Sequence, residues 1–592
     1  MKNKGNWLYG ILFGLLMVFL FSFMIQEHFR PFEFKKMNGL FAVVNKPDLT
    51  FDGYKDGTYQ KGTEKYLQTH FGFYEPIVRG YNQYCWDFYR KSMVSYIKCG
   101  KDNWLFYNHT IENYYGTEMY NWYKDVDAAR EGYEREIRLL NKVNGILRQY
   151  GVTFMTVIAP SKGTIYSELL PRGDYDTTTL KAADYFTKRF DELHLPYLDM
   201  TEVFFQMKDT CSFYLFQPLG HHWNFSCIYA ADTLFHFMEH QRGIKMPQIQ
   251  YGDKWLDGCR IGDDKFTDLQ SELNLMRPIK FKPKYNYRER DYWLTSDSTV
   301  TKPAVLITGN SFYLWMMHYI PPKECFSDLQ FWYYNKVAYQ GVDQLIDSVA
   351  KLDHLDYLLD ADYVVWFTSE SQMYHNTEGF AADALLQLCI GEDRFNTRYN
   401  EVKDSLYHDD LTRWRIAGNC DDELFKKLLV NYTKKMIYGD PEKFFPELAG
   451  EGIPTARNPR LLEESYWKKR DIRRQIKRDT KWMTNVSSFM VAQDISLQEA
   501  INQETDNVFF GRPLMRDTQV GKKEYREILI KQTEQIIWNY KEWLESVKAD
   551  AEKRGITIDE AVTLHATYTV DLQIHEGKIK LPETDTIPRG NL

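Results

Sequence analysis

Apolar residues fall into two patterns that alternate through the first two thirds of this chain. Short, mostly apolar runs, typical of buried strands, occur at 152–159, 195–198, 304–308, 330–334 and 363–367. Longer stretches with apolar residues at helical spacing occur at 130–150, 181–193 and 227–238. Strands that are apolar on both faces and alternate with helices predict an α/β fold. Its sheet should be mostly parallel and covered by helices on both sides.

The pattern changes near residue 400, where glycine becomes sparse, charge increases and strand patterns fade, so 401–592 is predicted to be helical. An internal repeat lies in this region: Trp482, Val486, Ile495, Ser496, Glu499 and Ala500 recur 61 residues later as Trp543, Val547, Ile556, Thr557, Glu560 and Ala561. Both copies contain the S/T-x-x-E capping box, which predicts two helix hairpins at about 470–506 and 531–567. These hairpins would serve either as a module that docks a partner or covers the substrate, or as a duplicated structural unit.

A strongly charged run, KKRDIRRQIKRDTK, occupies 468–481, just before the first hairpin. Its basic residues are suited to an acidic polymer or to lipid head groups. The simpler expectation is a solvated helix face.

The N-terminus contains an uncharged apolar run of 18 residues, Trp7–Met24. As a helix it would extend about 27 Å, close to the thickness of a bilayer core. No small-residue cleavage site follows, so 1–28 is expected to be an uncleaved membrane anchor and 29–400 the α/β domain. Basic residues flank the run on both sides and leave its orientation open.

Composition excludes several classes of function. The net charge of −8 gives no indication of a nucleic-acid partner. The eight cysteines form no C-x-x-C pair and the histidines lack metal-ligand spacing, so no metal site is expected, while disulfide pairing stays open. The high aromatic content of 16% is compatible with sugar-stacking surfaces or with aromatic-rich cores.

Candidate chemistry lies at the end of the apolar run 304–308. There Gly309, Asn310 and Ser311 form a strand-to-helix turn, which would expose the serine hydroxyl beside free backbone N–H groups. Asn310 would either brace this turn or donate to an oxyanion. A serine needs a neighbouring base, and the adjacent His221 and His222 offer one. Because neighbouring side chains of an extended segment point to opposite faces, only one of the two can face the serine.

Four segments, in order, resemble the SGNH hydrolase-like domain of the alginate O-acetyltransferase family, the AlgJ/AlgX type with its D-H-H-W motif. KDNWLFY at 101–107 is similar to G-x-D-G-W-L-F, and APSKGTIYSELLP at 159–171 to P-x-K-x-x-I-Y-P-E-x-L-P. GHHW at 220–223 matches D-H-H-W except at its first position, and TGNSF at 308–312 resembles G-D-S-F. The resemblance spans about 30–400 and implies an SGNH-hydrolase-like three-layer sandwich.

The resemblance implies that Ser311 is the nucleophile and His222 the general base. The implied reaction moves an acetyl group to a polysaccharide hydroxyl through an acetyl-serine ester, without a metal or other cofactor. It would take place at the outer face of the inner membrane, with a membrane-bound O-acyltransferase as acetyl donor. Supporting roles are expected for His221, Asn310 and Gly309, and substrate contacts for Lys162 and Trp223.

One departure affects activity, because the family aspartate that orients the base falls on Gly220. Loss of such a carboxylate costs serine hydrolases about 10⁴-fold in rate. Either another carboxylate such as Asp199 or a backbone carbonyl orients His222, or the enzyme is slow, or it is inactive.

The loop after the run 363–367 is expected at the ligand-binding edge of the sheet, where Glu370, Gln372 and Tyr374 are candidate glycan contacts or ordinary loop residues. The leading hypothesis is a membrane-anchored polysaccharide O-acetyltransferase. The alternatives are an inactive glycan-binding scaffold and a glycan acetyl esterase.

Overall fold

The computed structural model describes residues 4–39, 44–173, 180–257, 267–279, 288–297, 299–342, 344–417, 422–493, 495–512, 514–515, 522–539 and 541–575. Six cysteines in these ranges are free, namely Cys85, Cys99, Cys211, Cys227, Cys325 and Cys389. Cys259 and Cys420 lie outside the described residues, so the pairing question stays open for them.

A seven-stranded sheet with the order β10-β9-β8-β7-β11-β3-β4 forms the centre of the molecule. Its parallel strands are β3 (Thr153–Ala159), β4 (Tyr197–Asp199), β7 (Ala304–Gly309), β8 (Asp328–Tyr333) and β11 (Tyr363–Ser369). These five correspond to the apolar runs of the sequence. The antiparallel pair β9 (Val337–Gln340) and β10 (Gln344–Ser348) extends the β8 edge. Neither shows an apolar run, so neither was predicted.

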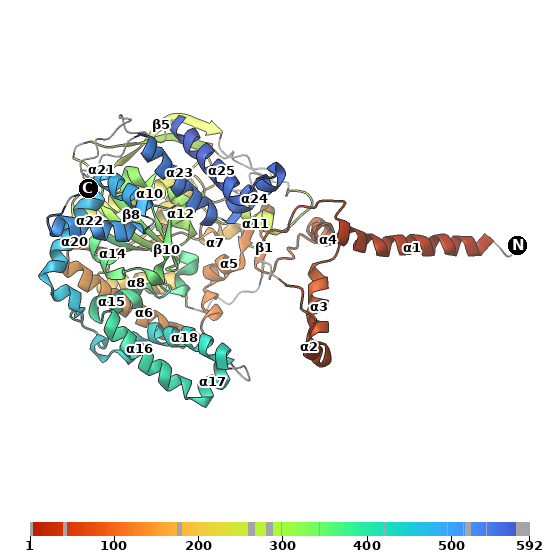
Figure 1. The fold of residues 1–592 in the computed structure, drawn as a ribbon, viewed down its shortest axis with the longest axis horizontal. Helices are drawn as coiled ribbons and strands as arrows, with labels where there is room; N and C mark the ends of the chain where they lie inside the picture. The colour runs from red at the N-terminus through yellow and green to blue at the C-terminus, as the bar shows by residue number, and fades with distance from the viewer. Residues whose placement is uncertain are drawn as a thin grey trace.

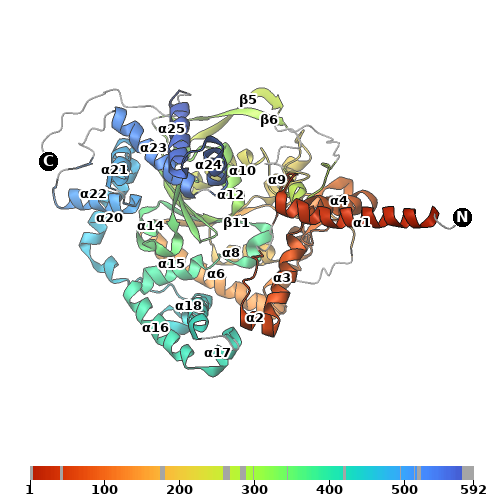
Figure 2. The ribbon, with the colours of Figure 1, turned by 45° about the vertical axis from the view of Figure 1, so that its right-hand side comes forward.

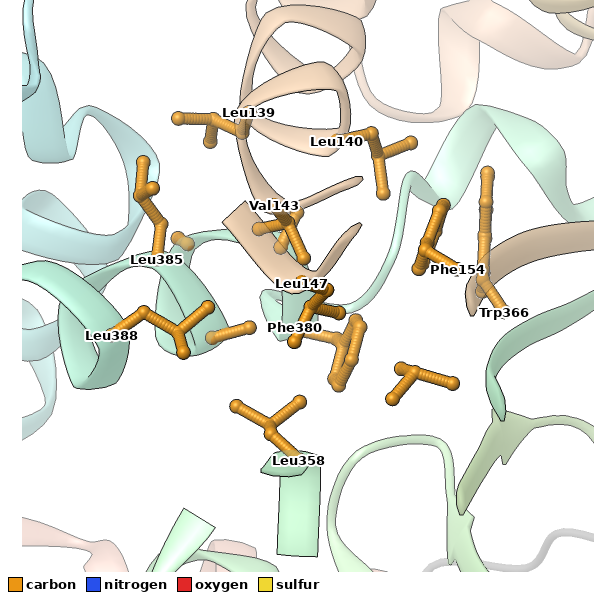
Figure 3. Close-up of a cluster of buried hydrophobic side chains, with 14 of the residues drawn as sticks. Leu139, Leu140, Val143, Leu147, Phe154, Leu358, Trp366, Phe380, Leu385 and Leu388 are labelled. Atoms are coloured by element: carbon orange, nitrogen blue, oxygen red, sulfur yellow. The ribbon is translucent and has the colours of Figure 1, made fainter. Parts of the chain in front are cut away.

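Alternate residues of the central strands enter two separate cores. On one side Phe154, Leu306 and Trp366 pack against α6 (Val126–Gln149), α8 (Ala182–Leu193), α14 (His354–Asp360) and α15 (Phe380–Cys389). Figure 3 shows part of this core, in which Val143 and Leu147 of α6 and Phe380 of α15 lie between the α15 leucines on one side and Phe154 and Trp366 on the other. On the other side Met155 and Ile307 pack against α10 (Cys227–Arg242) and α12 (Ser311–Tyr319). The domain therefore has the expected α/β fold, with helices on both faces of a mostly parallel sheet.

The N-terminal helix α1 (Lys4–Phe29) extends away from the body (Figure 1). Its segment Trp7–Phe29 is long and apolar enough to cross a membrane, with a mean hydropathy of 2.5 and none of the scored window buried; a signal sequence has the same properties. The end of α1 packs on the loop before α4 (Tyr74–Tyr89), where Phe23 meets Phe71 and Phe73 at ring distances of 6.0 and 5.7 Å.

Several short elements complete the N-terminal and central parts. The helices are α2 (Phe51–Asp56), α3 (Thr58–Thr69), α5 (Asn108–Tyr115), α7 (Lys162–Ile165), α9 (Thr201–Lys208), α11 (Asp268–Glu272) and α13 (Pro322–Cys325). Two further hairpin sheets pair β1 (Ile97–Cys99) with β2 (Leu105–Tyr107) and β5 (Gln248–Asp257) with β6 (Arg288–Thr295).

The chain after β11 and α15 is helical in its described parts. Its helices are α16 (Glu392–Tyr407), α17 (Asp410–Ala417), α18 (Asp422–Gly439), α19 (Pro441–Phe444), α20 (Glu464–Arg478), α21 (Thr480–Gln493), α22 (Leu497–Phe509), α23 (Lys522–Asn539), α24 (Lys541–Arg554) and α25 (Ile558–His575). Figure 2 shows them along the flank of the α/β body.

The repeated residues form two helix pairs, α21–α22 and α24–α25. Ser496 accepts from the Glu499 N–H at 3.2 Å, while the Glu499 carboxylate accepts from the Ser496 N–H at 2.8 Å. Thr557 and Glu560 form the same pair of bonds at the same distances. Trp482 and Val486 pack in a small core with Ala500, and Val547 packs with Ala561 in a second. Each hairpin therefore has a small core of its own.

The charged helix α20 is not a solvated face, so that expectation is wrong for its inward side. Arg473 lies 3.0 Å from both Asp356 and Asp360, and Lys477 lies 3.1 Å from Asp360. All four side chains are at most 4% exposed. We call these four residues the α20 clamp. The clamp joins the C-terminal helices to α14 of the α/β body. The charge pattern of the sequence showed the basic residues of α20, but it could not show that they pair with buried aspartates of α14.

Candidate active site

Ser311 occupies the first turn of α12, directly after the central strand β7. Asn310 caps this helix, because its Oδ1 accepts from the Phe312 N–H at 3.1 Å. Gly309 is required for space: a Cβ there would lie 2.7 Å from the Phe367 carbonyl oxygen on the neighbouring strand β11. The turn therefore presents the Ser311 hydroxyl at the carboxyl end of the sheet, near backbone N–H groups that lack helical partners.

His222 reaches Ser311 from a loop 89 residues upstream, with Nε2 lying 2.8 Å from the serine Oγ. Its ring is stacked 5.4 Å from Trp315 and lies 5.3 Å from Phe312. His221 points to the other side, is 5% exposed and packs 4.8 Å from the Tyr107 ring. Burial, followed by the nearby His222, lowers the pKa of His221 well below its usual range. The alternation predicted for the two histidines thus places His222 at the serine and keeps His221 neutral.

The carboxylate behind His222 is Asp268, the first residue of α11. Its Oδ2 lies 3.3 Å from Nδ1 of His222, and its Oδ1 accepts from the N–H groups of His221 and Leu269 at 2.9 and 3.0 Å. Burial opposes ionisation, but the contact with His222 and these two amides outweigh it and lower the pKa of Asp268 below its ordinary value. The carboxylate is therefore ionised at neutral pH and placed to stabilise a protonated His222.

Asp199, the candidate named for this position, does not occupy it. Its Oδ1 accepts from the Thr201 N–H at 2.9 Å, a turn at the end of β4. Asp268 follows His222 by 46 residues and belongs to no motif, so sequence reasoning missed it. Gly220 therefore removes the carboxylate from the histidine loop, and a different segment supplies one.

Residues near the N-terminus hold the turn that follows Asp268. Asn82 of α4 donates to the Leu273 carbonyl at 2.9 Å, and Gln83 accepts from the Arg277 N–H at 2.9 Å. Further upstream, Asn38 donates its N–H to Asn274 Oδ1 at 2.8 Å and accepts from the Asn274 amide at 2.7 Å. The position of the carboxylate thus depends on residues upstream of the first strand, β1.

Lys162 and Trp223, expected to contact substrate, are interior residues instead. The Lys162 ammonium, 1% exposed, donates to the carbonyls of Leu105, Gln217, Pro218 and Gly220 at 2.6 to 3.1 Å. Trp223, fully buried, donates its indole N–H to the Phe312 carbonyl at 3.1 Å. Buried donors need hydrogen-bond acceptors, and these two find backbone carbonyls. Lys162 thereby fixes the backbone at 217–220, and Trp223 ties the histidine loop to α12.

Two of the three candidate glycan contacts after β11 are also interior. Glu370, 3% exposed, accepts from the Ser161 N–H at 3.0 Å and the Thr164 hydroxyl at 2.7 Å, and it pairs with Lys181. Tyr374 is 7% exposed. Gln372 is partly exposed, and its Oε1 accepts from the Asn310 amide at 2.7 Å. The Asn310 amide also donates to Ser369 at 3.3 Å, so it braces the serine turn and is not free to meet an oxyanion.

The described residues contain no group of three His, Cys, Asp or Glu side chains placed to hold a metal ion. The chemistry available at this site is that of an alcohol, an imidazole and a carboxylate in sequence. Such an arrangement can transfer the serine proton to His222 while Ser311 forms an ester.

A central parallel sheet, a serine at the first turn of a helix after its central strand and a histidine from a remote loop together define an SGNH hydrolase-like domain. Residues 97–312 match the family described as the SGNH hydrolase-like domain of the acetyltransferase AlgX. The predicted resemblance is thereby confirmed for residues 97–312, which are similar to the SGNH hydrolase-like domain of this acetyltransferase family. The matched segment contains His222, Asp268 and Ser311, and it excludes α1–α4.

Three solved structures with low sequence identity are similar to part of the chain. The O-acetyltransferase domain of Pseudomonas putida AlgJ shares 16% identity over 47% of this chain and 92% of its own, with a TM-score of 0.32. Pseudomonas aeruginosa AlgX shares 13% identity over 48% of this chain and 66% of its own, with a TM-score of 0.31. Bacillus cereus PatB1, solved with a sulfonyl adduct, shares 13% identity over 48% of this chain and 98% of its own, with a TM-score of 0.29. No curated protein matched the sequence.

Proposed function

We propose that this protein is a membrane-anchored O-acetyltransferase that transfers acetyl groups to hydroxyls of an extracellular or cell-wall polysaccharide. The observation that supports this most strongly is the 2.8 Å contact between His222 Nε2 and Ser311 Oγ, inside a segment that matches an acetyltransferase family. In this proposal Ser311 is the nucleophile, His222 the general base and Asp268 the carboxylate that orients His222.

The reaction has two halves. Ser311 Oγ attacks the acetyl carbonyl while its proton moves to His222 Nε2, and Asp268 stabilises the imidazolium. The oxyanion accepts hydrogen bonds from backbone amides at the start of α12. His222 then protonates the leaving group, which leaves an acetyl-serine ester. In the second half a sugar hydroxyl attacks this ester, His222 takes its proton, and the proton returns to Ser311 as the acetylated sugar leaves.

The acetyl donor and the location follow from the anchor. We infer that 1–28 spans the inner membrane once and that the α/β domain (29–400) and helical region (401–592) lie on the periplasmic or extracellular side. Cytoplasmic acetyl donors are out of reach there. A membrane-bound O-acyltransferase would therefore pass the acetyl group across the bilayer. The apolar helix α1 and its packing on the loop before α4 support this arrangement.

Hydrolysis of a nitrophenyl acetate by the full chain in detergent tests the proposal. The wild type should release nitrophenol, and Ser311→Ala and His222→Ala should each lose this activity by about 10⁶-fold, to the background level. Adding an oligosaccharide distinguishes the alternatives: a transferase yields acetylated sugar, whereas an esterase yields only acetate. Equal, background release by all three chains would contradict the proposal and favour an inactive scaffold.

A further inference from the structure

The helix α4 turns polar residues toward the body and apolar residues toward the outside. Asn82 and Gln83 are buried on its inner side, where they hold the turn after Asp268. Four apolar residues on its outer side are between 46 and 73% exposed, namely Ile77, Tyr81, Tyr84 and Phe88. We call these four residues the α4 stripe. A contiguous exposed apolar surface usually marks a contact with another molecule or with a membrane.

The α4 stripe is narrow and its orientation is fixed. Its members follow one another at intervals of four, three and four residues, so at 3.6 residues per turn they fall within an arc of about 60°. The rings of Tyr84 and Phe88 lie 4.9 Å apart. On the inner side of the helix, Trp86 packs in a buried core with Ile97 and Leu105. Because Trp86 and the bonds of Asn82 and Gln83 hold the helix, the stripe cannot turn inward.

The start of α4 is fixed beside the last turns of α1. A Cβ at Gly72 would lie 2.2 Å from the Phe23 carbonyl oxygen, so the loop before α4 lies directly against α1. The Phe73 ring also meets Phe32, just after α1, at 6.4 Å. Figures 1 and 2 both show α4 at the inner end of α1. If α1 crosses a bilayer, α4 therefore begins at the surface of that bilayer.

The residue types of this region suit a lipid–water interface. Two of the four stripe residues are tyrosines, and tyrosine is enriched where a bilayer meets water because its ring is apolar and its hydroxyl is polar. The short helices α2 and α3, which also extend from the base of α1, bury no residue (Figure 1). They expose Phe51, Tyr54 and Leu67. The exposed apolar surface is thus continuous in sequence with the membrane segment and spreads over several elements around it, as contact with a bilayer requires.

We propose that the α4 stripe lies in the head-group region of the bilayer that α1 crosses, so that α4 is an interfacial helix. This inference rests on the proposed membrane anchor. It adds a second membrane contact, which would fix how the body is oriented on the bilayer surface. The same helix holds the turn after Asp268, so the proposed catalytic carboxylate is joined to the membrane surface through a single helix.

Photocrosslinking to lipid tests the proposal on the full chain. The protein carries p-benzoylphenylalanine in place of Tyr84 and is reconstituted in nanodiscs made of equal parts phosphatidylcholine and phosphatidylglycerol. Irradiation should yield a covalent adduct whose mass exceeds that of the chain by one phospholipid. The same replacement at Trp414, which is 72% exposed on α17, is the matched control and should give no lipid adduct. The replacement at Phe19, which is 59% exposed within α1, tests the anchor itself.

The pattern of adducts separates this inference from the proposed anchor. Lipid adducts at Phe19 but not at Tyr84 would overturn the interfacial helix and leave the anchor standing. A crosslinked dimer at Tyr84 would also overturn it, because a second copy of the chain would then cover the α4 stripe. A lipid adduct at Tyr84 without one at Phe19 would support the interfacial helix and contradict the proposed span. Adducts at neither position would contradict both.

A second measurement uses the unmodified chain and so avoids any effect of substitution on folding. Lactoperoxidase iodinates only those tyrosines that a soluble enzyme can reach. Tyr568 on α25 is 69% exposed, and in nanodiscs it should be iodinated readily. Tyr81 and Tyr84, which are 56 and 49% exposed, should be iodinated at least about tenfold less, because the bilayer covers them. Comparable iodination of all three tyrosines would overturn the proposal. Neither measurement depends on turnover, so a failure of nitrophenyl acetate hydrolysis would contradict only the proposed reaction.

Discussion

The α20 clamp and the His222–Asp268 pair each place a carboxylate beside a basic side chain, and they differ in how completely these contacts are satisfied. In the clamp, Arg473 and Lys477 reach Asp356 and Asp360 at 3.0 to 3.1 Å, with all four side chains nearly inaccessible. In the active site, Asp268 approaches His222 only to 3.3 Å. The His222 and Asp268 side chains are 15% and 32% exposed.

This difference distinguishes charged side chains that hold the fold together from a carboxylate that supports the proposed reaction. Buried ions are stable only when their partners are fully provided, and the clamp meets that condition, so it holds two regions in one geometry. At His222, the Nδ1 atom has no well-aligned hydrogen bond among the described residues, and the ring must change its protonation state during the proposed reaction. An incompletely satisfied pair can adjust to a transient charge, which a rigid network cannot do.

The largest expected effect is on catalysis, from Asp268→Asn. This change keeps the shape but removes the charge that stabilises a protonated His222, so kcat for nitrophenyl acetate should fall by about 10⁴-fold. The unfolding midpoint should change little. Asp297→Asn, which removes a carboxylate that is 58% exposed, is the matched control and should retain wild-type kcat. A tenfold loss or less would show that another group supports His222.

The next effect is on stability, from Arg473→Met in the clamp. It leaves Asp360 buried with fewer compensating charges, and the free energy of unfolding should fall by about 3–5 kcal/mol. Urea unfolding followed by circular dichroism measures this. Lys468→Met on the same helix breaks a surface pair with Glu464 and should cost less than about 1 kcal/mol. Similar losses for both variants would mean that the clamp contributes no more than a surface ion pair.

Glu118, a buried carboxylate that accepts from the Ala182 N–H at the start of α8, should make stability depend on pH. Burial raises the pKa of Glu118 from 4.5 to about 7, so the folded state holds its proton more tightly than the unfolded state. Stability should therefore decrease between about pH 4.5 and pH 7, by about 3 kcal/mol, and remain level above that window. Glu118→Gln should abolish this contribution. Parallel pH profiles of unfolding for the variant and the wild type would refute the assignment.

The smallest expected effect concerns the capping boxes of the two hairpins. Ser496→Ala and Thr557→Ala each remove a hydroxyl that accepts from a helix N–H, at a cost of about 1 kcal/mol. Ser487→Ala makes the same change inside α21 and should be neutral or slightly stabilising. Thermal unfolding in detergent compares the three variants, and an equal response from all of them would exclude a capping contribution.

The features that could be predicted from the sequence are those encoded by residues adjacent along the chain. Apolar runs predicted the five parallel strands, and the turn at Gly309–Ser311 and the pair His221–His222 mark the reacting groups. These features are local, because a strand or a tight turn needs particular residues at adjacent positions.

Contacts between remote segments were beyond the sequence. Asp268 meets His222 only because α4 and the turn at 273–277 bring α11 there, and no spacing encodes that meeting. Lys162, Trp223 and Glu370 carry functional-looking side chains, yet their partners are buried carbonyls, amides and ions. Polar residue type alone cannot distinguish a substrate contact from an interior brace.

Asn38, Asn82 and Gln83 hydrogen-bond to the turn after Asp268, and these bonds determine where the chain can be truncated. A shortened chain that starts at Ile97, where the family match begins, would keep Ser311 and His222. It would lose the hydrogen bonds that position the turn after Asp268. Cutting instead after residue 28 spares all three braces. The segment needed for an intact active site therefore begins upstream of residue 97, where the family match begins.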